Sequence, residues 1–251
     1  MKNFRIFAVI IALLWSVGAW ADAAAFVKRG DALMAQRVQP GKAKAAIQEY
    51  QKALAVDPGL VDAYWKISKA YYWVGIHEKS KDKKLKSFKD GIEFGKMCIQ
   101  AAPKSAECHY WLGVAYGKYG EAKGILQSLY LIPFMKKELK ATIKLNDKIR
   151  MYGAYSVLGW VNFKTDKGII PAEKRGSTKK ALELLAKAVK LGPKNLVSRY
   201  FYARVLLATD KKAEAIKQLE YIISAPVTPD VAPEFNEEKV KAKKLLKELR
   251  G

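Results

Sequence analysis

One pattern recurs along this chain: an aromatic-rich apolar helix, a small residue, a turn signal, a second helix and a stop that contains proline. The clearest copy reads AECHYWLGVAYGKYGE from Ala106 to Glu121, and a looser one, VDAYWKISKAYYWVG, begins at Val61. A repeated helical hairpin cannot bury its apolar face alone, so it must stack on its neighbours. The sequence therefore predicts an all-α solenoid, an architecture that usually presents a surface for binding.

The spacing within each copy resembles the tetratricopeptide repeat (TPR), a hairpin of two helices about 34 residues long. In a unit that starts at Ala106, the core positions of the first helix hold Leu112, Gly113 and Tyr116. Small residues at such positions let two helices approach closely, while larger residues fill the space beside them. The resemblance implies a right-handed α-solenoid of about five TPR-like hairpins with long inter-helix insertions.

The copies give the limits of the units. We expect hairpins near residues 23–60, 61–105, 106–151, 152–195 and 196–229. A basic amphipathic helix over 236–251 is predicted to cap the last unit. Two insertions stand out: Gly124 to Phe134 is apolar, and Lys167 to Ser177 is typical of a loop. The apolar insertion either plugs the concave side or offers a contact surface to a partner or a second copy.

The first 21 residues are predicted to be a signal peptide. Lys2 and Arg5 precede an apolar run from Ile6 to Gly18, and the following Ala-Trp-Ala has small residues at both recognition positions of a cleavage site. Cleavage near Ala21 gives a soluble periplasmic or secreted protein, and an uncleaved membrane anchor is the alternative. No cysteine directly follows the apolar run, so we expect no lipoprotein.

The chain is strongly basic, with 46 Lys and Arg against 24 Asp and Glu and a formal net charge of +22. For an exported protein this favours acidic proteins, anionic lipids or anionic small molecules as partners over nucleic acid. The alternative is a solvated basic surface that has no specific partner.

The two cysteines stand on either side of a predicted hairpin turn at Pro103. Cys98 lies five residues before this proline and Cys108 five residues after it. On facing helices the two sulfurs would then lie at a similar height, which suits a disulfide. The alternative is a pair of small buried thiols.

In a TPR protein, the concave wall is formed by a second stripe of the first helices. Here that stripe is aromatic, with cations beside the rings. The predicted ligand- or partner-binding residues are Trp65, Lys69, Tyr72, Tyr110, Trp160, Phe163, Tyr200 and Arg204. Rings flanked by cations suit an amphipathic anion. The alternative is that the insertions cover this wall and make it ordinary core.

The sequence offers little for catalysis. The two histidines, His77 and His109, have no metal-ligand spacing with each other or with a carboxylate pair. A glycine-rich phosphate loop, a nucleophile elbow and a zinc-protease motif are all missing from the sequence. We therefore expect a non-enzymatic protein without cofactor or metal.

A narrower resemblance rests on HYWLGVAYGKYGEAKGILQSL, followed by a long helix and GAYSVLGW. These segments resemble the periplasmic T-component proteins of TRAP-type transporter systems and, more distantly, the tetratricopeptide-type regulator of microtubule dynamics family. The T-component resemblance implies a scaffold that docks an envelope partner such as a solute-binding or transport component. The alternative is a carrier that binds a fatty acid or lipid in its aromatic concave groove. Either protein could form a homo-oligomer.

Overall fold

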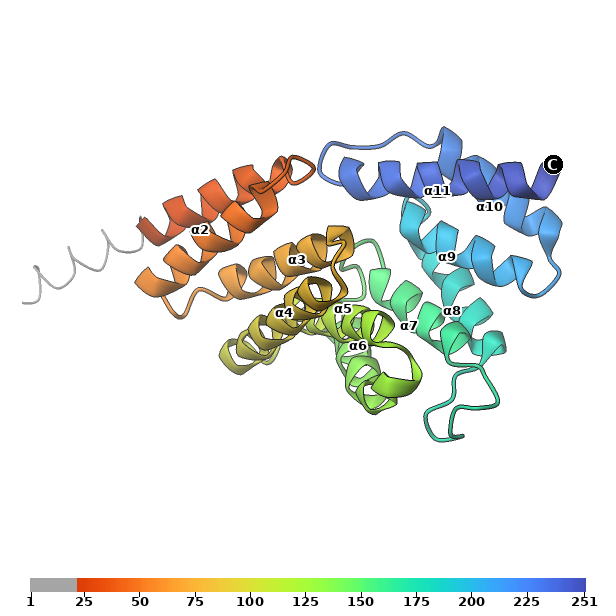
Figure 1. Cartoon of the computed structure of the whole chain (residues 1–251), viewed down its shortest axis with the longest axis horizontal. Helices are drawn as coiled ribbons and strands as arrows, with labels where there is room; N and C mark the ends of the chain where they lie inside the picture. Colours follow the sequence, from red (N-terminus) through yellow and green to blue (C-terminus); the bar gives the residue numbers. More distant parts are fainter. Residues whose placement is uncertain (1–21) are drawn as a thin grey trace, which may run out of the picture. The chain divides into compact units, whose positions relative to one another are not determined.

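The computed structural model describes residues 22–251, and the regular elements within them are helices (Figure 1). This confirms the predicted all-α class. The predicted signal peptide, residues 1–21, lies outside the described residues. The described chain divides into two compact units: unit 1 ends at Pro103, and unit 2 spans Lys104–Gly251. Among the described helices, none combines the length and the apolar character that crossing a bilayer requires.

The described part of unit 1 consists of helices in which each packs on the next. They are residues 22–35, α2 (Lys42–Val56), α3 (Val61–His77) and α4 (Lys81–Ala101). Small residues permit close approach: a Cβ on Gly30 would lie 2.4 Å from Cε1 of Tyr50, and one on Gly75 would lie 2.3 Å from Cε1 of Phe88. At these two contacts of unit 1, a large ring occupies the space left by a glycine.

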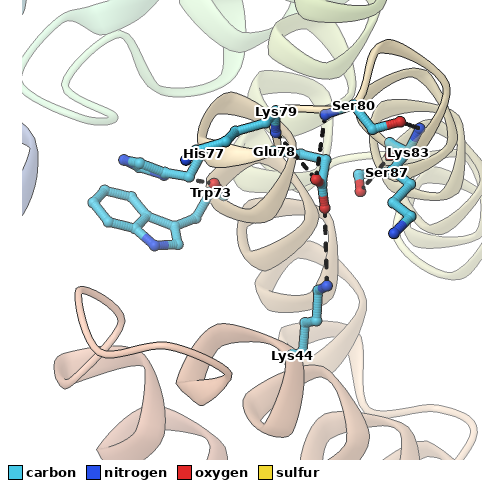
Figure 2. Close-up of polar contacts among 8 residues, drawn as sticks. All are labelled: Lys44, Trp73, His77, Glu78, Lys79, Ser80, Lys83 and Ser87. Carbon is cyan, nitrogen blue, oxygen red and sulfur yellow. Dashed lines mark hydrogen bonds and ion pairs between the residues drawn. The ribbon is translucent and has the colours of Figure 1, made fainter.

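Polar contacts close the short turn between α3 and α4 (Figure 2). The Glu78 carboxylate accepts hydrogen bonds from the backbone N–H groups of Lys79 (3.0 Å) and Ser80 (3.4 Å), and its other oxygen lies 4.0 Å from Nζ of Lys44. The Ser80 hydroxyl caps α4 by accepting from the backbone N–H of Lys83. In this hairpin the extra residues lengthen the helices themselves, to 17 and 21 residues, and the connection stays short.

Unit 2 continues the series of hairpins and ends in a single helix. Its elements are α5 (Ala106–Lys123), the 3₁₀ helix η1 (Leu126–Leu131), α6 (Ile132–Asn146), α7 (Gly153–Lys164), α8 (Thr178–Leu191), α9 (Leu196–Leu207), α10 (Lys212–Ser224) and α11 (Ala232–Arg250). The two predicted insertions contain η1 and the loop between α7 and α8. Helix α11 places Phe235, Ala242 and Leu246 in the core cluster of α9 and α10, in the manner of the predicted capping helix.

Two glycines of unit 2 have the predicted role of letting paired helices touch. A Cβ on Gly113 of α5 would lie 2.8 Å from Cγ of Leu139 in α6, and one on Gly159 of α7 would lie 2.7 Å from Cγ of Leu185 in α8. Both leucines are fully buried. The hairpins α5–α6 and α7–α8 thus pack by the same small-against-large contact.

The turn between α6 and α7 contains three consecutive residues in the left-handed region. The φ angles are 49° at Arg150, 52° at Met151 and 62° at Tyr152. The side-chain amide of Asn195, which precedes α9, donates to the carbonyls of Arg150 (3.0 Å) and Met151 (3.2 Å). Left-handed backbone is costly for such residues, and these hydrogen bonds help to hold it.

Candidate binding surface

The predicted binding residues fall in both units, and those of unit 1 lie on α3. Trp65, Lys69 and Tyr72 are each half-buried. The Trp65 indole N–H donates to the carboxylate of Asp62 (3.0 Å), and the ammonium of Lys66 lies 5.5 Å from the centroid of the Trp65 ring. In unit 1 the orientation of Trp65 is therefore supported by neighbours on its own helix.

In unit 2, aromatic and cationic side chains gather around Trp160 of α7. Its ring stacks on Phe201 of α9, with centroids 4.7 Å apart and planes at 13°, and Phe163 lies 5.7 Å away. The guanidinium carbon of Arg204 lies 5.8 Å from the Trp160 ring and the ammonium of Lys164 lies 5.6 Å from it. Cations at this distance from an indole are attracted by its quadrupole. We call these five residues, with Glu121, the Trp160 cluster.

Glu121 connects the cluster to α5. One carboxylate oxygen accepts a hydrogen bond from the Trp160 indole N–H (3.0 Å), and the other accepts from Nζ of Lys118 (2.9 Å). Burial alone would raise the pKa of Glu121, but Lys118, the indole and Lys164 outweigh it, and the pKa lies below its ordinary value. The ionised carboxylate thus fixes the Trp160 ring from a neighbouring hairpin.

Burial shows that the Trp160 cluster is partly core and partly surface. Trp160 and Phe163 are half-buried, Tyr200 is half-buried and packs toward the C-terminal core cluster, and Arg204 is exposed. Trp160 and Phe163 pack against a small buried cluster made of Ala181, Leu185 and Val205. The aromatic stripe was predicted to be either a binding wall or ordinary core. Here it is both, because the half-buried rings pack on the core with one part and remain accessible, beside the cations, with the other.

Tyr110 is a correction. Its side chain is buried, with 8% exposed, and its ring meets that of Trp111 edge-on at 5.2 Å. A Cβ on Gly153 would lie 2.8 Å from the Tyr110 hydroxyl, so the tyrosine fills the space between α5 and α7. Tyr110 belongs to the core, contrary to its predicted place on an open wall. On the same helix, a Cβ on Gly117 would lie 3.0 Å from Sδ of Met135 in α6.

Sequence reasoning missed Phe201, Lys164 and Glu121. Phe201 directly follows the predicted Tyr200 in a run of rings, so the stripe was assigned one residue away from the side chain that stacks on Trp160. Lys164 stands four residues after Trp160, a spacing that brings side chains together on a helix. Glu121 lies 39 residues before Trp160, and no local pattern predicts their contact.

The groups that could carry chemistry lie outside the Trp160 cluster. His109 of α5 contacts Glu138 of α6, with Nδ1 and Oε2 2.5 Å apart, and both side chains are buried. Cys98 and Cys108 are both disulfide-bonded. Within residues 22–251, His, Cys, Asp and Glu do not gather in threes or more as a metal site would require. The cluster itself offers aromatic rings, two cations and one ionised carboxylate that is paired with Lys118, and these groups suit non-covalent binding.

Comparison with protein families identifies a match along most of the chain. The model of the family described as "Regulator of microtubule dynamics protein 1-3" matches residues 26–250. No curated protein sequence matches the chain. Of the two family resemblances drawn from the sequence, the more distant one is thus confirmed, and the T-component resemblance stays a prediction.

Solved structures with the same architecture are TPR proteins. TTC0263, a thermophilic TPR protein of Thermus thermophilus, matches with a TM-score of 0.61 and 19% identity, covering 87% of this chain and 99% of that chain. PilF of Pseudomonas aeruginosa matches with a TM-score of 0.56 and 14% identity, covering 93% and 94%. MamA matches with a TM-score of 0.50 and 21% identity, covering 88% and 94%. At such identities the likeness shows the fold alone, and it confirms the predicted TPR-type α-solenoid.

Proposed function

The chain belongs to the regulator of microtubule dynamics protein 1-3 family, and we propose that it is a non-enzymatic TPR-type scaffold that docks a protein partner on the Trp160 cluster. The observation that carries the proposal is the accessible edge of stacked rings with Arg204 exposed beside it. Contacts from three first helices, α5, α7 and α9, hold this surface in place. A surface fixed in advance binds without a large ordering cost.

The chemistry of the cluster defines the partner segment. An aromatic or aliphatic side chain of the partner would cover the exposed edges of Trp160 and Phe163, and an acidic side chain would pair with Arg204 and Lys164. Aromatic and arginine side chains at the centre of an interface commonly dominate its binding energy. Following the predicted export and the T-component resemblance, we propose an envelope protein, such as a solute-binding or transport component, as this partner.

A charge reversal at Arg204 tests the proposal. The side chain is exposed, so Arg204→Glu is expected to leave folding intact while it repels an acidic partner segment. Lys217→Glu on α10 is the matched control, because it makes the same charge change at another exposed position of unit 2. The two variants and the wild-type chain are compared as bait against an envelope extract by quantitative mass spectrometry.

Two outcomes decide the test. A stoichiometric protein that the wild-type and Lys217→Glu chains retain, and that Arg204→Glu retains at least tenfold less, supports the scaffold. Equal retention of every protein by all three chains contradicts docking on the Trp160 cluster. Circular dichroism of each variant verifies that helix content is unchanged.

A second candidate function is a carrier of an amphipathic anion. The observation that favours it is the charge of the Trp160 cluster: Arg204 and Lys164 lie near the ring, while its one carboxylate, Glu121, is paired with Lys118. Such a site suits an acyl or aryl group with an anionic head. Native mass spectrometry of detergent-free protein separates the two functions, because a carrier retains a small molecule that Arg204→Glu releases.

A further inference from the structure

The apolar insertion of unit 2 is only partly packed. Its inner side is anchored, since Leu131 and Ser128 are buried and the Ser128 hydroxyl donates to backbone carbonyls, the nearest of which is that of Gly124 at 2.7 Å. Its outer side is open: Leu126 is 57% exposed and Tyr130 50% exposed. The sequence left open whether this segment is a plug or a contact surface. Its inner side packs as a plug would, and its outer side is exposed as a contact surface would be.

The open side continues onto the neighbouring helices. The ammonium of Lys123, at the end of α5, lies 5.4 Å from the centroid of Tyr130 and 5.7 Å from that of Tyr119. Phe134, 52% exposed at the start of α6, lies 6.2 Å from the ring of Tyr116. We call Tyr119, Leu126, Tyr130 and Phe134, together with Lys123, the η1 patch.

Apolar side chains that gather at a surface differ from scattered ones. Ile169 and Val240 of unit 2 are even more exposed, at 70% and 68%, but no exposed apolar residue adjoins them in the sequence: Ile169 lies between Gly168 and the buried Ile170, and Val240 lies between Lys239 and Lys241. Isolated exposed apolar residues are ordinary, whereas a group of large ones marks a contact surface. The η1 patch is therefore a candidate interface that is separate from the Trp160 cluster.

The exposed charges on η1 and α6 have one sign, and the exposed carboxylate of Glu121 on α5 is paired with Lys118. Between residues 123 and 146 the basic residues are Lys123, Lys136, Lys137, Lys140 and Lys144. The one acidic residue of this segment, Glu138, is buried and paired with His109, so it does not face the surface. Burial and the nearby charge of Lys140 lower the pKa of Lys136. A partner of the η1 patch must therefore bring negative charge as well as apolar surface.

We propose that the η1 patch binds peripherally to the surface of an anionic lipid bilayer. Leucine and phenylalanine side chains have a favourable transfer free energy into the boundary between headgroups and acyl chains. Tyrosine side chains are stable at the level of the headgroups, and lysines are attracted by anionic lipids. A second copy of this chain fits less well, because a symmetric contact would bring the lysines of two copies together. An anionic bilayer can also meet both needs at once, because its acyl layer contacts the apolar side chains while its headgroup layer contacts the lysines.

The test uses the full chain and large unilamellar vesicles of phosphatidylcholine alone or with phosphatidylserine. We expect binding to require phosphatidylserine and to weaken with salt. The substitutions Leu126→Ser, Tyr130→Ser and Phe134→Ser, made together, are expected to reduce binding at least tenfold. Lys137→Ala and Lys140→Ala are each expected to reduce it about fivefold. Ile169→Ser and Lys244→Ala, at other exposed positions of unit 2, are the matched controls.

A local reporter separates the η1 patch from the rest of the chain, including the apolar residues near the N-terminus. A cysteine substitution, Leu126→Cys, labelled with an environment-sensitive fluorophore, is expected to shift to the blue on anionic vesicles. The same label after Ile169→Cys is expected to stay unchanged. Equal binding to both kinds of vesicle, or an unshifted label at residue 126 on bound protein, overturns the proposal.

One further result would also overturn it. If sedimentation shows a dimer that the triple serine variant dissolves, the η1 patch is a contact between copies of the chain. Circular dichroism of the triple variant verifies folding, and the two lysine variants keep the test valid if that variant does not fold.

Discussion

At the start of α9, Asn195 uses both ends of its side-chain amide. Its oxygen caps the helix by accepting from the backbone N–H of Ser198 (3.1 Å), and its nitrogen donates to the carbonyls of Arg150 and Met151. The side chain is 6% exposed, so water does not readily replace these partners. One residue thereby caps the start of α9 and also holds the α6–α7 turn, which contains three left-handed residues.

Asn195→Ala should lower the free energy of unfolding by about 2–3 kcal/mol, because it removes a helix cap and two further hydrogen bonds. Asn195→Asp keeps the capping oxygen and loses the amide donors, so its smaller decrease in the free energy of unfolding should come from the α6–α7 turn alone. Urea unfolding measures both values. An alanine variant as stable as the wild type would show that neither turn depends on this side chain.

Two carboxylates of unit 2, the buried Glu238 and the exposed Glu121, respond to pH in opposite directions. Burial raises the pKa of Glu238 above 4.5, although Lys241 and Lys118 oppose the shift, and one of its oxygens lacks a hydrogen-bond partner in the described structure. Glu121 has a lowered pKa for the reasons given above. Ionisation of Glu238 therefore disfavours the folded state, and ionisation of Glu121 favours it.

Glu238→Gln should make the chain more stable at neutral pH. The pKa of Glu238 is higher in the folded state than in the unfolded state. The destabilisation caused by its ionisation therefore grows as the pH rises from about 4.5 through the folded pKa, and it vanishes below that range. Glu121→Gln should destabilise at neutral pH, and its effect should fade as the pH falls through the lowered folded pKa. Thermal unfolding at several pH values measures both curves. Parallel curves for wild type and Glu238→Gln would contradict the assignment.

The same residues show what a sequence can and cannot reveal. The aromatic stripe predicted Trp160 and Arg204 because periodicity places each of them on the corresponding face of its own helix, α7 or α9. It could not distinguish the accessible Trp160 from the buried Tyr110, since burial depends on the helix that covers each side chain. Nor does a local pattern predict the contact of His109 with Glu138, because it joins residues 29 positions apart.

At the scale of helices, the repeat pattern predicted the hairpins well and their ends less well. Helix α11 begins at Ala232, earlier than the predicted residue 236, because Pro233 is suited to a first turn, where its missing N–H costs nothing. The extra length of each unit was expected between the helices. In the α3–α4 hairpin it lies within them, since polar lysine-rich sequence continues a helix as readily as it forms a loop.

Gly159→Ala should push α7 away from α8 and lower the free energy of unfolding by about 1–3 kcal/mol. The new methyl group would lie 2.7 Å from Cγ of Leu185 and 3.3 Å from the carbonyl oxygen of Ala181. Gly168→Ala is the control, because its methyl group would have no neighbour within 4 Å. Urea unfolding of both variants should show a loss for the first alone. Equal stabilities would contradict the close packing of the two helices.

At the scale of the whole chain, the fold could be predicted because a repeat constrains every hairpin in the same way. The partner could not, since complementarity depends on a surface to which separate helices contribute. Phe201, Glu121 and Trp160 meet only after three hairpins have packed. The TPR-type fold is therefore established, whereas the proposed scaffold role and its partner have to be tested by binding experiments.

The disulfide state of Cys98 and Cys108 gives a prediction for the intact protein. Without reductant, neither residue should react with a thiol-alkylating reagent under denaturing conditions, and after reduction both should react. Replacing both by serine should cost about 2–3 kcal/mol of stability, as expected for so short a loop. Mass spectrometry counts the alkyl groups. Alkylation of both residues without reductant would contradict the bond.

The contact between Asn195 and the α6–α7 turn also bears on how the chain folds during synthesis. The donor lies 45 residues after the carbonyl of Arg150, so the turn is complete only when the ribosome has released the beginning of α9. The α5–α6 hairpin is therefore synthesised before the residue that stabilises the turn at its C-terminal end. Until that point the α6–α7 turn lacks the two hydrogen bonds from Asn195, so local order in the turn depends on a residue of a later hairpin.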